Sequence, residues 1–67
     1  MTPIKVVAMR LKKLRKQRGM SQEALAEKAG ISRSYLARLE TARHDPTLTV
    51  LEKLAKALRV KIDKLVK

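Results

Sequence analysis

Residues 22–40 read QEALAEKAGISRSYLARLE and carry the clearest structural signal in this chain. Apolar side chains recur at helical spacing on both sides of Gly30, at Leu25, Ala29, Ile31, Leu36 and Leu39. Gly30 can take the left-handed conformation that a sharp turn needs, because it has no Cβ. Ala26, four residues earlier, is small enough to let a second helix cross closely over the first. The pattern predicts two short helices joined by a tight turn.

A serine stands directly before each of these two predicted helices. Ser21 and Ser32 can each accept a backbone N–H from the first helical turn, which makes them N-cap residues. Met20, just before the first serine, can pack against Leu25 as a hydrophobic staple. We therefore expect one helix of about eight residues after Ser21 and a second from Ser32 to about Thr41.

The flanking segments predict three more helices. Residues 5–18 place apolar side chains at helical spacing among Lys and Arg, and Gly19 follows as the predicted helix end. Thr47 can cap a helix that runs to residue 58. A last segment, residues 62–66, has Lys61 where a capping Ser or Thr would be expected, so we expect it to fray. No segment alternates with the period of a strand, which predicts an all-α fold of five helices.

The 22–40 stretch resembles the helix-turn-helix of the phage-repressor family, the Cro-like or XRE-type DNA-binding domains. LRKQRGMSQ at residues 14–22 is similar to the segment that leads into that motif, and DPTLTVLEKLAKALRV at residues 45–60 is similar to the family's fourth helix. The resemblance covers most of the chain in the family's order, without insertions. It implies a lambda-repressor-like five-helix DNA-binding bundle that occupies residues 1–67 as a single domain, with the helix-turn-helix at about 21–41.

The same resemblance implies a set of DNA contacts. The helix from Ser32 to Thr41 would lie in the major groove as the recognition helix. The positions that match base-contacting residues are Ser32, Arg33, Ser34 and Arg38. Those that match phosphate-contacting residues are Ser21, Gln22, Tyr35 and Arg43. Arg15 and Glu40 match a buried ion pair that ties the first helix to the third.

Ala42 departs from the family pattern, which usually places Gly just after the recognition helix. Either Ala42 adopts the left-handed conformation, at a cost of about 1 kcal/mol, or the helix continues past it. The path of Arg43 and His44 depends on which alternative holds.

Composition and charge narrow the classes of function. Seventeen Lys and Arg against six Asp and Glu give a net charge of +11, which favours an anionic partner. The chain has no Cys and one His, so we expect no metal, no cofactor, no small-molecule ligand and no enzymatic activity. No apolar run has the length of a membrane span, and the first residues do not read as a signal peptide, so we expect a cytoplasmic, nucleoid-associated protein.

These observations predict a sequence-specific, double-stranded-DNA-binding transcriptional regulator. One recognition helix reads too few bases to single out a site in a genome. We therefore expect a homodimer on an inverted-repeat operator, weak in the absence of DNA. The expected dimer interface is apolar surface near the end of the chain, at Val60, Ile62, Leu65 and Val66.

Two other classes of function stay open. The same fold could serve as an antitoxin-like or protein-interaction module that binds DNA only for autoregulation. A basic helical module on RNA or on an anionic membrane is a further alternative, although a membrane-surface helix usually carries Trp or Phe and this chain has neither. Lys12, Lys13 and Lys16 are most simply read as a solvated face that aids solubility.

Overall fold

The computed structural model describes residues 2–67, which form five helices and no strand. In chain order the helices are α1 (Ile4–Gln17), α2 (Gln22–Ala29), α3 (Arg33–Glu40), α4 (Leu48–Leu58) and α5 (Asp63–Val66). The predicted all-α class and order of elements are confirmed. The observed helix ends lie within one residue of the predicted ones.

Three of the helices begin at a hydroxyl side chain that satisfies a backbone N–H of the first turn. The Ser21 Oγ accepts from the Ala24 N–H at 3.0 Å, and the Ser32 Oγ accepts from the Tyr35 N–H at 3.0 Å. Thr47 does the same for α4, at 3.1 Å from the Val50 nitrogen. These bonds span three residues, so the local sequence is sufficient to place the start of each helix.

Four helix ends share one hydrogen-bond pattern, in which an N–H bonds back to the carbonyl five residues earlier. The donors are the N–H groups of Met20, Ile31, Arg43 and Val60. This pattern requires a left-handed residue just before each donor. Gly19 and Gly30 fill two of these positions, with φ of 67° and 71°, while Ala42 and Arg59 fill the other two, both with φ of 58°. The sequence predicted the two glycine ends and left Ala42 as one of two alternatives, but it gave no signal at Arg59.

Ala42 therefore adopts the left-handed conformation, and α3 does not continue past it. Ala42→Gly should raise the free energy of unfolding by about 0.5–1 kcal/mol, because the Cβ penalty of the left-handed conformation disappears. Thermal unfolding should show a rise in Tm of roughly 2–8 °C. The matched control is Ala37→Gly inside α3, which should lower stability by about 1 kcal/mol. A loss of stability in Ala42→Gly would contradict the assignment of strain to this position.

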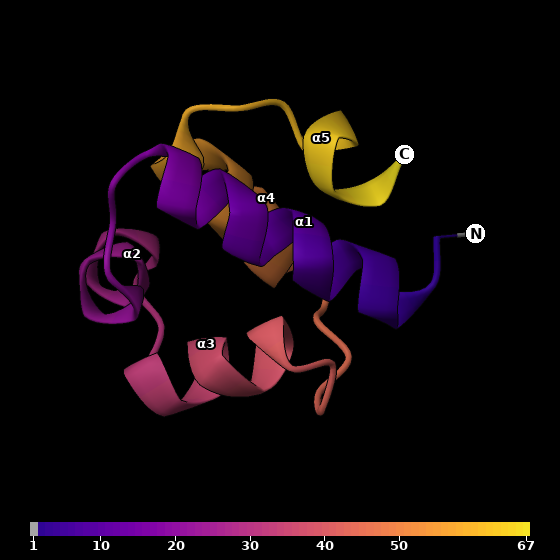
Figure 1. The fold of residues 1–67 in the computed structure, drawn as a ribbon, viewed down its shortest axis with the longest axis horizontal. Helices are drawn as coiled ribbons and strands as arrows, with labels where there is room; N and C mark the ends of the chain where they lie inside the picture. The colour runs from indigo at the N-terminus through magenta and orange to yellow at the C-terminus, as the bar shows by residue number, and fades with distance from the viewer. Residues whose placement is uncertain (1) are drawn as a thin grey trace.

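One hydrophobic core lies between the five helices. It consists of Val7, Leu11, Leu25, Ala26, Ala29, Leu36, Leu39, Leu51, Leu54, Ala55, Leu58 and Leu65. α2 packs on both α3 and α4, and α1 packs on α3 and α5. In Figure 1, α1 crosses in front of α4, and α3 lies along the opposite edge of the molecule from α5. This arrangement leaves the outer side of α3 free of other helices.

The packing of α5 differs from one expectation about the dimer interface at the end of the chain. Leu65 has 0% exposed surface and belongs to the core, so its assignment to an exposed dimer interface was wrong. α5 has no side-chain N-cap, as its sequence predicted, yet other parts of the chain hold its last turn. The Arg10 guanidinium donates to the Leu65 carbonyl at 3.4 Å, and the Thr2 hydroxyl donates to the Val66 carbonyl. The start of the described chain at Thr2 and the last helix accordingly lie on one side of the bundle (Figure 1).

Candidate nucleic-acid interface

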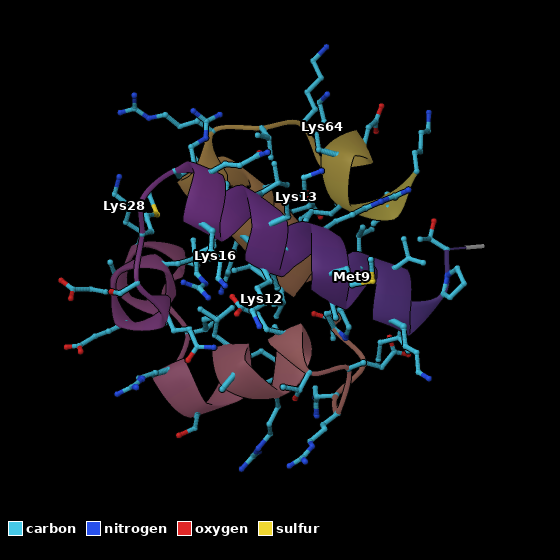
Figure 2. All side chains as sticks on the ribbon, in the orientation of Figure 1. Met9, Lys12, Lys13, Lys16, Lys28 and Lys64 are labelled. Atoms are coloured by element: carbon cyan, nitrogen blue, oxygen red, sulfur yellow. The ribbon has the colours of Figure 1, made fainter. Side chains whose placement is uncertain are left out.

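α3 divides into a buried side and an exposed side. Leu36, Leu39 and Glu40 are buried against the bundle, whereas Arg33 and Arg38 are exposed. The outward-facing residues are Arg33, Ser34 and Arg38, with the half-buried Ala37 and the C-cap residue Thr41. At 3.6 residues per turn they fall within an arc of about 140°. Figure 2 shows nitrogen-tipped side chains extending from α3 away from the rest of the molecule. The exposed side of α3 is therefore a convex, cationic surface.

The N-cap serines of α2 and α3 are exposed beside this surface. Each serine oxygen accepts a backbone N–H, and a hydroxyl can donate as well as accept. The hydroxyl hydrogens of Ser21 and Ser32 therefore remain for a second partner. Both hydroxyls also lie at the positive ends of helix dipoles, where an oxygen anion is favoured.

A buried ion pair connects α3 to α1. The Arg15 Nε lies 2.7 Å from the Glu40 Oε2, and the Arg15 Nη2 lies 3.0 Å from the Glu40 Oε1. The side chains are 10% and 2% exposed, so the pair is two-pronged and almost dry. The Arg15 Nη1 also donates to the Met20 carbonyl at 2.8 Å, which ties the pair to the start of α2. The ion pair that the resemblance implied is thus present.

Gln22 joins the same network, which sequence reasoning did not foresee. Its Nε2 donates to the Glu40 Oε1 at 3.1 Å, and the residue is half-buried. The amide nitrogen carries two hydrogens, so one remains for a partner outside the protein. Because the other amide hydrogen bonds to the Glu40 carboxylate, the ion pair sets the orientation of the Gln22 amide.

The segment after α3 brings together residues from two elements. The ring of His44 packs edge-on against Tyr35, with centroids 5.0 Å apart and planes at 74°. This geometry is a favourable arrangement for two aromatic rings and restrains the half-buried Tyr35. Arg43, between Ala42 and His44, is exposed. The sequence did not predict this contact of His44, because nothing in the spacing of the residues signals a contact formed across a turn.

The residues assigned to the interface by sequence thus lie in the neighbouring elements α2, α3 and the segment after α3. Those assigned to dimerisation lie elsewhere, after α4 and in α5. Val60, Ile62 and Val66 are half-buried and pack against the core, while Leu65 is inside it.

A helix-turn-helix family model matches residues 11–65. The chain belongs to the helix-turn-helix family. This confirms the family that the 22–40 stretch and its flanks indicated. The helix-turn-helix itself is formed by α2 and α3, which meet at the left-handed Gly30.

Two curated relatives of this helix-turn-helix chain are named as regulators. The immunity repressor protein of Bacillus phage phi105 is 47% identical over 60 residues, which are 90% of this chain and 42% of that protein. The transcriptional regulator SinR of Bacillus subtilis is 38% identical over 58 residues, 85% of this chain and 52% of that protein. The chain therefore spans about half the length, or less, of these two relatives.

Solved structures of helix-turn-helix proteins share the whole fold. The restriction-modification controller protein C.AhdI from Aeromonas hydrophila superposes with a TM-score of 0.91 at 35% identity, covering 92% of this chain and 94% of that one. A structure of SinR in complex with DNA gives a TM-score of 0.84 at 38% identity, covering 88% of this chain and 95% of that one. The five-helix arrangement is therefore that of known helix-turn-helix regulators.

Residues 2–67 offer neither a metal centre nor a membrane span. No group of three or more His, Asp and Glu side chains in this part of the chain could hold a metal ion. None of its helices has the length and apolar character needed to cross a membrane.

Proposed function

We propose that this domain binds double-stranded DNA in a sequence-specific manner and acts as a transcriptional regulator. The observation that carries the proposal is the exposed side of α3, which presents Arg33 and Arg38 from a helix whose other side is buried in the core. An α-helix fits the major groove, and an Arg fork can hold the O6 and N7 of guanine. The names of the relatives, a phage repressor and a regulator solved with DNA, support it.

Within this proposal the interface residues take two roles. Ser32, Arg33, Ser34 and Arg38 contact base edges, because they line the exposed start and side of α3. The proposed phosphate contacts are Ser21, Gln22, Tyr35 and Arg43. Ser21, Gln22 and Arg43 flank α3 on both sides, and Tyr35 lies within α3, between its exposed and buried sides. Phosphate contacts position the helix, and base contacts supply the specificity. Regulation of this kind takes place where the chromosome lies, in the cytoplasm and associated with the nucleoid.

The proposal includes a homodimer on an inverted repeat. A single α3 offers about four base-contacting side chains, too few to distinguish one site from the competing sites of a genome. The interface that we propose uses Val60, Ile62 and Val66, which are half-buried and apolar, without the buried Leu65. Because this patch is small, the dimer is weak until both halves sit on DNA.

Selection of bound sequences from random duplexes tests the function and the dimer together. Sequence-specific binding should enrich one short motif, and a two-fold dimer should enrich it as an inverted repeat with half-site centres about 10 base pairs apart. Val66→Glu should remain folded and enrich single half-sites. Recovery of no common motif would contradict specific binding. An inverted repeat recovered equally well by Val66→Glu would place the dimer contact elsewhere.

A further inference from the structure

A second exposed surface, on α1, has no part in the proposed DNA contacts. It consists of Met9, Lys12, Lys13 and Lys16, and we refer to it as the α1 ridge. All four are exposed, and among residues 2–67 Met9 is the most exposed large apolar residue, at 69%. The side of α1 that faces the bundle carries Val7, Ala8, Leu11 and Arg15. Figure 2 shows the four labelled ridge residues along α1, while α3 lies at the lower edge of the molecule.

The charge of the α1 ridge is not compensated within the chain. No Asp or Glu occurs before Glu23. In the described residues, the ion pairs are Arg15–Glu40 and Lys67–Asp63, so no ridge lysine has a carboxylate within 4.0 Å. Lys12 and Lys16 are also four residues apart, a spacing at which like charges weaken a helix. Repulsion between these lysines therefore destabilises α1 locally, and a bound anion would relieve it.

One end of the α1 ridge, at Met9, is apolar, which separates it from a surface made for phosphates. Met9 and the lysines Lys12, Lys13 and Lys16, with Gln17, line one shallow, open stretch of surface. The lysine stems add apolar surface beside the Met9 thioether, which adapts its shape to a partner. A DNA backbone offers charge to the lysines but nothing apolar to Met9. A protein segment offers both.

We propose that the α1 ridge docks an acidic amphipathic helix of a partner protein. Glutamates of that helix pair with Lys12, Lys13 and Lys16, and one of its aliphatic side chains packs on Met9. The ridge extends from residue 9 to residue 16, about 10 Å along the axis of α1, so two turns of the partner cover it. Because the ridge lies on the outer side of α1 and not on α3, the partner and DNA can occupy the domain together.

The test uses a synthetic peptide of about 16 residues with a row of Leu along one helical face and Glu on both sides of it. Titration into ¹⁵N-labelled protein should saturate and shift the amides of α1. Lys13→Glu/Lys16→Glu should weaken binding at least about tenfold, because two attractions become repulsions. Met9→Gln should weaken it about threefold to fivefold without changing the charge.

The matched control is Lys53→Glu/Lys56→Glu on α4. Both pairs are exposed lysines three residues apart near the end of a helix, and both doubles change the net charge equally. The control should weaken peptide binding less than about twofold. Equal losses from both doubles, an unchanged affinity in Met9→Gln, or equal binding of a scrambled peptide of the same composition would each overturn the proposal.

The same variants distinguish DNA binding by the α1 ridge from docking of a partner helix. Lys13→Glu/Lys16→Glu could lose more affinity for duplex DNA than Lys53→Glu/Lys56→Glu and keep its affinity for the peptide. In that case the ridge would belong to the DNA interface and the docking proposal would be wrong. If the parent chain bound the peptide at the ridge and no duplex at all, the DNA proposal would fail and the docking proposal would stand. The Tm of each variant confirms that it is folded.

Discussion

Replacing Glu40 with Ala should cost about 3–5 kcal/mol of stability and leave a large fraction of the domain unfolded at moderate temperature. Removal of the carboxylate leaves the Arg15 guanidinium, with a side chain only 10% exposed, without its charged partner. It also removes the acceptor of the Gln22 amide. A 67-residue domain is stable by only roughly 3–10 kcal/mol in total. Thermal unfolding followed by circular dichroism should show a Tm lower by more than about 10 °C.

The matched control is Glu27→Ala, since Glu27 is exposed on α2 and forms no ion pair in the described structure. Its effect should stay within about 0.5 kcal/mol. The double variant Arg15→Met/Glu40→Leu should recover most of the loss, because an apolar pair of similar size carries no desolvated charge. Small and equal shifts of Tm in Glu40→Ala and Glu27→Ala would show that the ion pair contributes nothing to stability.

Affinity for duplex DNA should fall steeply as salt rises. Each phosphate that a Lys or Arg neutralises releases counterions, so the logarithm of the affinity falls by about 0.9 per phosphate for each decade of salt. A dimer that neutralises about six phosphates should lose roughly 10³-fold in affinity between 50 and 200 mM salt. Fluorescence anisotropy with a labelled duplex measures this slope. An affinity that stays flat over this range would contradict DNA binding by this +11 chain.

The same titration separates the two proposed roles of the interface arginines. Arg43→Ala should weaken binding to the selected site and to random duplex alike, and should lower the salt slope by about 1 for each phosphate that is no longer neutralised. Arg33→Ala should cost about 1–3 kcal/mol on the selected site and little on random duplex. If Arg33→Ala weakened both duplexes equally, Arg33 would bind a phosphate and not a base.

The sequence by itself determined the features that depend on contacts a few residues apart. The starts of α2, α3 and α4 were predictable because each hydroxyl bonds an N–H three residues ahead. The turn between α2 and α3 was predictable because Gly30 is suited to the left-handed conformation that it adopts. The exposed side of α3 followed from helical periodicity, which assigns buried and exposed positions once the helix is known.

The tertiary structure alone decided features that depend on residues far apart in the chain. Leu65 looked like surplus apolar surface, because a helix of four residues is too short for periodicity to define its buried side. Its burial follows from packing between α5, α1 and α4, and Arg10 reaches the Leu65 carbonyl across 55 positions. The left-handed conformation of Ala42 was one of two open alternatives in the sequence, and only the structure shows that Ala42 adopts it. Gln22 became part of the ion-pair network because folding brings the start of α2 against the end of α3, a proximity that no local spacing encodes.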